Sequence, residues 1–75
     1  MGKPDWIMVR DGLAARIASG EWAPDDRLPT EPDLCRSFGV GRHSVRRAIH
    51  ALAADGAVRA EQGRGTFVHS APLFR

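Results

Sequence analysis

The sequence predicts a small α+β domain in which three helices precede a wing of two or three short β-strands. Apolar residues recur at helical spacing up to Gly56, and after Gly56 the period changes to two. The last two apolar runs flank a glycine-rich loop, as in a β-hairpin. A chain of 75 residues has room for one domain. We place this domain at residues 1–69 and expect 70–75 to be a linker or tail.

The first helix is expected over roughly 5–19. Asp5 can serve as its N-cap, and Gly20 can end it. The apolar stripe that would face the core consists of Trp6, Val9, Leu13 and Ile17. The following segment, 21–29, is a loop because it contains two prolines and two adjacent aspartates. Leu28 would anchor this loop and can form one short strand position.

The second helix is expected over about 31–37. Thr30 and Asp33 fit the capping pattern at its start, where a proline is tolerated. Gly39 would end this helix. Its inward-facing residues are expected to be Leu34, Cys35 and Phe38.

A third helix over about 42–55 follows a tight turn and ends at Gly56. The second and third helices thus form a helix-turn-helix in outline. The core face of the third helix has the spacing i, i+3, i+4, i+7 and consists of Val45, Ala48, Ile49 and Leu52. In the strand-like run 57–61, alternation puts Val58 and Ala60 on one face. A second strand is expected over 66–69, with 62–65 as the hairpin loop.

The charge is unevenly distributed along the chain. Residues 1–35 hold four basic and seven acidic side chains, a net charge of −3, whereas residues 36–69 hold six basic and two acidic ones, a net charge of +4. This asymmetry favours a polyanionic partner. A dipolar surface without a function would also explain it.

Basic side chains are concentrated at the beginning of the third helix, opposite its core face. The helix dipole disfavours cations there, so an anionic partner would compensate for the cost. Arg42 and Arg46 lie one turn apart, and each can donate two hydrogen bonds to a guanine edge in the major groove. Ser44 and the amides of the first turn suit phosphate oxygens. The candidate DNA contacts on this helix are Arg42, His43, Ser44, Arg46 and Arg47.

The hairpin loop offers a second contact with DNA. Gly63-Arg64-Gly65 places an arginine between two residues without side chains, and such a narrow loop tip can enter a minor groove. A nucleotide-binding loop is the competing interpretation, but no third glycine, following helix or lysine-Ser/Thr pair supports it.

We expect neither a metal ion nor another cofactor. The conceivable metal ligands lack metal-site spacing; they are Cys35, His43, His50 and His69. Without a nucleophile–base constellation, we also expect no enzymatic activity. One cysteine and the absence of a secretory signal favour the cytoplasm.

The stretch "LPTEPDLCRSFGVGRHSVRRAIHALAADGAVRAEQGRGTFV" (28–68) resembles the N-terminal winged helix-turn-helix of the GntR family of bacterial transcription factors. Residues 5–20 match the first helix of that family, including Ile17 and Gly20. The runs "RHSVRRAI" and "QGRGTFV" are most similar to the HutC-type branch and, within it, to regulators of phosphonate metabolism. The resemblance implies a transcriptional repressor that binds double-stranded DNA sequence-specifically.

The resemblance also implies roles for individual residues. Arg42 and Arg46 would read bases, while Thr30 and Ser44 would contact phosphates. Glu31 matches the acidic residue of the family's "LP-x-E" motif and would orient the arginines. In the wing, Gly63 would contact the minor groove. We add its neighbours as candidates: Arg64, Gly65 and Thr66.

Two positions depart from the family pattern. Gly41 replaces the usual Ser, Thr or Asn, which weakens the helix cap and its phosphate contact. Pro32 removes a basic side chain that contacts DNA in some members.

We expect a homodimer on a palindromic operator, without membrane contact. A small-molecule effector would act only through a C-terminal domain absent from this sequence. A winged helix that docks proteins and binds no specific DNA sequence remains the alternative.

Overall fold

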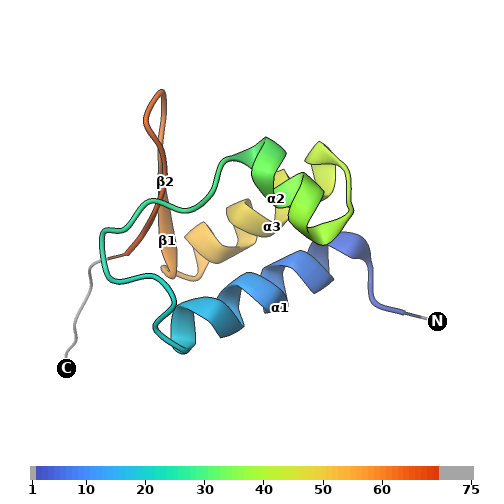
Figure 1. The fold of residues 1–75 in the computed structure, drawn as a ribbon, viewed down its shortest axis with the longest axis horizontal. Helices are drawn as coiled ribbons and strands as arrows, with labels where there is room; N and C mark the ends of the chain where they lie inside the picture. The colour runs from blue at the N-terminus through green and yellow to red at the C-terminus, as the bar shows by residue number, and fades with distance from the viewer. Residues whose placement is uncertain (1, 70–75) are drawn as a thin grey trace.

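The computed structural model describes residues 2–69 and contains three helices followed by a two-stranded antiparallel sheet (Figure 1). The helices are α1 (Asp5–Ala18), α2 (Glu31–Phe38) and α3 (Arg42–Ala54), and the strands are β1 (Val58–Glu61) and β2 (Gly65–Val68). The predicted winged helix-turn-helix architecture is therefore confirmed. The expected tail, 70–75, lies outside the described residues.

The core lies between the three helices and the base of the hairpin. All four predicted core residues of α3 are buried, and Val9 and Leu13 of α1 are fully buried beneath them. The buried apolar residues are Val9, Leu13, Leu28, Leu34, Val45, Ala48, Ile49, Leu52, Val58 and Val68. Each element thus contributes at least one residue to a single core, which fixes α3 and the hairpin relative to each other.

The first helix differs from the prediction at its beginning. Pro4, not Asp5, is the N-cap, and its carbonyl accepts hydrogen bonds from Ile7 and Met8 at 3.0 and 3.1 Å. Asp5 already lies in the first helical turn, where its carboxylate complements the helix dipole. Gly20 ends the helix as predicted, with a φ of 84°. The C-cap is Ser19.

The hairpin is the wing of the fold and projects away from the helices (Figure 1). Val58 pairs with Val68 at its buried base, and Glu61 pairs with Gly65 near its tip. Gly65 therefore belongs to β2, so the connecting loop is shorter than predicted. Ala60 is exposed, although it lies on the same face of β1 as buried Val58, because the core reaches only the base of the projecting strands.

The loop before α2 pairs with the outer edge of β2. Arg27 makes an isolated antiparallel bridge with Phe67, and the amide of Leu28 donates to the carbonyl of Thr66 at 2.8 Å. Leu28 is buried, so it anchors this loop as expected. The predicted third strand is therefore a short bridge. Within residues 2–69, no helix is long and apolar enough to cross a bilayer.

Candidate nucleic-acid interface

The N-terminal half of α3 presents basic side chains on the surface opposite the core. Arg42, His43, Arg46 and Arg47 are all exposed, and the first turn of α3 contains no acid. Gly41 caps the helix without a side-chain hydrogen bond, as its lack of a side chain requires. Amide hydrogens of the first turn are therefore free to bind an anion. Ser44, which also lies in this turn, is half-buried.

Glu31 connects the first turn of α2 to the exposed face of α3. The Nε hydrogen of Arg46 points at both Glu31 carboxylate oxygens, with N–O distances of 3.0 and 3.1 Å. The Arg46 side chain remains 60% exposed. The ion pair therefore restricts the arginine's stem and leaves its terminal nitrogens available, which is what a base-reading arginine needs.

Thr30 and Asp33 form the predicted capping box of α2. Thr30 Oγ1 accepts the amide hydrogen of Asp33 at 3.3 Å, and Asp33 accepts the amide hydrogen of Thr30 at 3.4 Å. Hydrogen bonds from Thr30 lower the pKa of the Asp33 carboxyl below its ordinary value. The capping box thus fixes the Thr30 side chain at the start of α2.

Arg47 lies against α1 and apart from Arg46. Its guanidinium carbon is 4.5 Å from the centre of the Trp6 ring, and that of Arg10 is 5.4 Å from the same ring. Arg10 also pairs with Asp11 at 2.9 Å. The indole thus holds Arg47 by cation–π attraction at the edge of the α3 surface. This contact was not predicted, because the one-dimensional pattern assigned Trp6 only to the core stripe.

The wing places two glycines with positive φ next to its arginine. Gly63 has a φ of 80° and open space around it, and Gly65 has a φ of 126°. Arg64 pairs with Glu61 at 3.1 Å and lies above the Phe67 ring, so its guanidinium extends along the wing. Its side chain is still 72% exposed. Thr66 is half-buried in β2.

Arg59 braces the wing against the loop before α2. Its guanidinium pairs with Glu61 at 2.7 Å and with Asp25 at 2.9 Å, and it donates to the carbonyl of Val68 at 3.2 Å. The hydrogen bond to Glu61 is the main cause that raises the pKa of Arg59 above its usual range. The brace stiffens the wing, and sequence reasoning missed it because it joins residues 34 positions apart.

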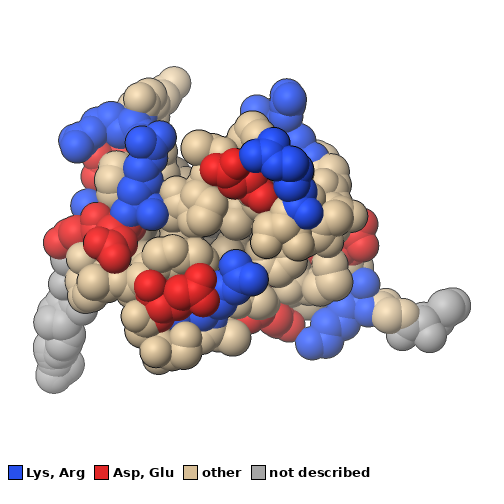
Figure 2. All heavy atoms as spheres, in the orientation of Figure 1, with Lys and Arg blue, Asp and Glu red and all other residues tan. Residues whose placement is uncertain are grey.

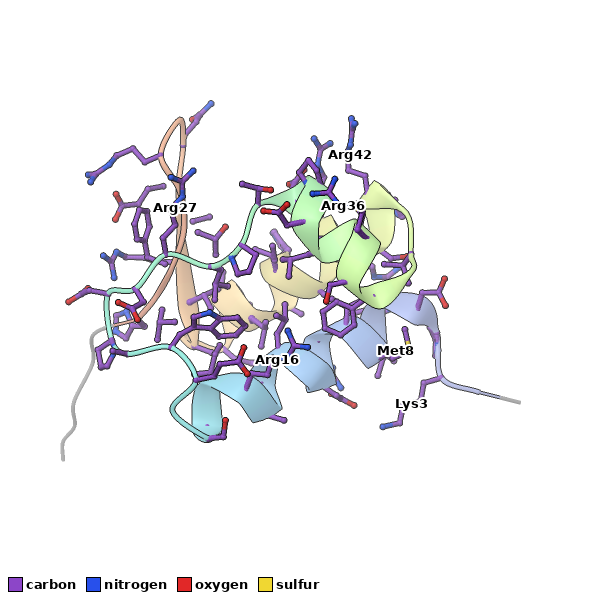
Figure 3. All side chains as sticks on the ribbon, in the orientation of Figure 1. Lys3, Met8, Arg16, Arg27, Arg36 and Arg42 are labelled. Carbon is purple, nitrogen blue, oxygen red and sulfur yellow. The ribbon has the colours of Figure 1, made fainter. Side chains whose placement is uncertain are left out.

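Figure 2 shows Lys and Arg side chains gathered over the wing and over the corner where α2 meets the start of α3. Figure 3 places Arg42 on the side of the molecule to which the wing tip projects. The structure thus brings Glu31 and Arg46 into direct contact, and puts the wing residues on a separate projection. Among residues 2–69, no three His, Cys, Asp or Glu side chains lie close enough to share a metal ion.

Comparisons with known proteins match this arrangement. The model of the gntR family of bacterial regulatory proteins matches residues 7–68. A histidine utilization repressor of Klebsiella aerogenes is 38% identical over 65 residues, which are 87% of this chain and 27% of the repressor. An arabinose metabolism transcriptional repressor of Geobacillus stearothermophilus is 35% identical over 65 residues, or 87% of this chain and 18% of that protein. The chain thus spans less than a third of these curated relatives.

Solved structures agree with the fold. The DNA-binding domain of AraR in a crystal structure with operator ORR3 has a TM-score of 0.87 and 38% identity, and the match covers 91% of this chain and 82% of that one. A GntR family regulator from Listeria monocytogenes also has a TM-score of 0.87, at 19% identity, covering 92% of this chain and 60% of that one. At 19% identity, the match to the Listeria monocytogenes regulator supports the fold alone.

Proposed function

Since the chain belongs to the gntR family of bacterial regulatory proteins, we propose that it binds double-stranded DNA sequence-specifically and represses transcription. The observation that carries the proposal is the exposed pair Arg42 and Arg46 at the start of α3, with Arg46 oriented by Glu31. A relative with 38% identity is a DNA-binding domain crystallised with its operator. In the proposed complex, α3 lies in the major groove.

The wing supplies the second part of the proposed complex. Gly63, at the tip, has no side chain to obstruct its approach to a minor groove, and Arg64 is exposed beside it. The amides at the start of α3, together with Thr30 and Ser44, would contact phosphates and set the position of the helix. One such domain makes too few base contacts for high specificity, and two of them on a palindromic operator would double that number.

The remaining parts of the proposal follow from the relatives. Two relatives are named as repressors of histidine utilization and of arabinose metabolism, so we propose that a small-molecule effector acts through a further domain in the intact regulator. The chain itself would have no enzymatic activity and would work in the cytoplasm, where its DNA is.

The experiment that tests the proposal measures binding to duplex DNA against salt concentration. A site is first selected from random duplexes by the wild-type chain, and affinity is then compared for this site and an unrelated duplex. Arg46→Ala should cost about 1–3 kcal/mol on the selected site and relax its base preference. Ser44→Ala should weaken both duplexes alike. If the wild-type chain selects no site and shows no steep salt dependence, it is a protein-docking module instead.

A further inference from the structure

Arg27 lies along the outer edge of the wing and is not among the expected DNA contacts. Its backbone bridges Phe67 in β2, yet its side chain reaches Gly65, two residues nearer the wing tip. A Cβ placed on Gly65 would lie 2.8 Å from Arg27 Nε and 3.5 Å from its guanidinium carbon. The arginine therefore lies across the one residue of β2 that has no side chain.

The backbone that carries Arg27 is tied to the wing on both sides. Asp25 donates its amide hydrogen to Val68, and Val68 donates its own to Asp26, at 2.9 and 2.8 Å. The amide of Leu28 donates to Thr66. The backbone at Arg27 is thus fixed beside β2, so that only the side chain would have to be ordered when it binds a ligand.

The charge of Arg27 is not neutralised by its neighbours. Among residues 2–69, Arg27 and Arg42 are the arginines with neither a carboxylate within 4.0 Å nor an aromatic ring beneath the guanidinium. The two nearby acids have other partners: Asp25 pairs with Arg59, and Asp26 accepts the amide hydrogen of Ala23. Arg27 is also exposed.

From these contacts we propose that Arg27, whose side chain lies over Gly65, binds a DNA backbone phosphate beside the wing; this inference rests on the proposed function. A wing tip in the minor groove has a phosphate strand on each side, and Arg27 lies outside β2 on the edge away from β1. Figure 3 shows Arg27 and Arg42 extending toward the same side of the molecule, the side to which the wing projects. The ligand is a phosphodiester, since a planar guanidinium forms paired hydrogen bonds with it irrespective of sequence.

The test compares Arg27→Gln with Lys3→Gln on a mixed-sequence duplex and on the selected site. Both substitutions remove one positive charge, but Lys3 is exposed at the start of the chain, away from the wing (Figure 3). Arg27→Gln should lower the slope of log affinity against log salt by about 0.9 on both duplexes. Its loss of affinity should therefore be about threefold greater at 50 mM than at 200 mM salt. Arg27→Lys should keep the wild-type slope, and Lys3→Gln should change nothing.

The outcomes separate the two proposals. If the wild-type chain binds steeply and Arg27→Gln keeps its slope, Arg27 contacts no phosphate, whereas the proposed function stands. If Arg27→Gln weakens the selected site alone, Arg27 reads a base and the phosphate assignment is overturned. A wild-type chain without salt-dependent DNA binding overturns both. Thermal melting of each variant confirms that the compared chains are folded.

Discussion

Glu31 and Arg46 join α2 to α3 through the surface that we propose contacts DNA. The Arg46 Nε hydrogen is shared by the two carboxylate oxygens at 3.0 and 3.1 Å, while the end of the arginine is open to solvent. An exposed pair of this kind contributes only about 0–1 kcal/mol to folding. Its main effect is thus to orient Arg46, and orientation determines which bases an arginine can read.

Glu31→Gln tests this role. The amide keeps the size of the side chain but loses the charge that holds Arg46 and repels phosphate. Affinity for an unrelated duplex should rise a few-fold at low salt, while the preference for the selected site should fall by up to about tenfold. Glu21→Gln is the matched control, because Glu21 lies after α1 and only approaches Arg16, at 3.9 Å. An unchanged preference in Glu31→Gln would show that Arg46 needs no partner.

Gly63 and Gly56 allow backbone strain to be separated from DNA contact. Their φ values are 80° and 82°, and a Cβ on either would meet no atom within 4 Å. Alanine at each position should therefore cost a similar amount of stability, about 1–2 kcal/mol in urea unfolding. Only Gly63→Ala should also weaken DNA binding, since Gly56 follows α3 far from the wing tip. Equal DNA affinities for the two folded variants would place the tip outside the complex.

The stack of Arg47 on Trp6 should stabilise the fold. At 4.5 Å from the ring, the guanidinium of Arg47 should contribute about 0.5–1 kcal/mol, and more than Arg10 at 5.4 Å. A double-mutant cycle of Arg47→Gln with Trp6→Leu, measured by urea unfolding, isolates this coupling. The Arg10→Gln cycle with the same Trp6 variant provides the comparison. A coupling near zero for Arg47 would mean that the ring only packs against the arginine's stem.

These contacts show where sequence reasoning succeeds. Periodicity alone identified the buried face of α3, because a helix places i, i+3, i+4 and i+7 on one side regardless of its surroundings. The capping box at Thr30 and Asp33 and the stop at Gly20 were equally local, since each depends on residues within one turn. All six helix ends therefore lie within one residue of the prediction.

Contacts between elements were much less predictable. The Trp6–Arg47 stack and the approach of Arg27 to Gly65 join segments 41 and 38 positions apart, and their geometry depends on how the helices and the wing pack. Nothing in the spacing of an arginine tells whether it will be paired, stacked or free. The family resemblance anticipated the contact of Glu31 with Arg46, because a family motif reflects packing that its members share. For Arg27, the only local signal was a basic residue next to buried Leu28.

The capping box also predicts how stability depends on pH. The bonds from Thr30 lower the pKa of Asp33 in the folded state, so the ionised carboxylate stabilises the fold above the unfolded-state pKa. This contribution is lost as the pH falls through the lower, folded-state value. Between pH 6 and pH 2, the free energy of unfolding should therefore fall more steeply in the wild type than in Asp33→Asn.

Thr30→Ala provides the second arm of that experiment, because Thr30 is the main cause of the lowered pKa. It should cost about 1 kcal/mol at pH 7 and flatten the acid dependence in part, because the backbone amide of residue 30 and Arg36 still lower the pKa of Asp33. Thr66→Ala, which changes a threonine of β2 outside the capping box, should keep the wild-type slope. Urea unfolding followed by circular dichroism at each pH gives the measurement. Identical slopes for Thr30→Ala and the wild type would mean that the two side chains do not interact in solution.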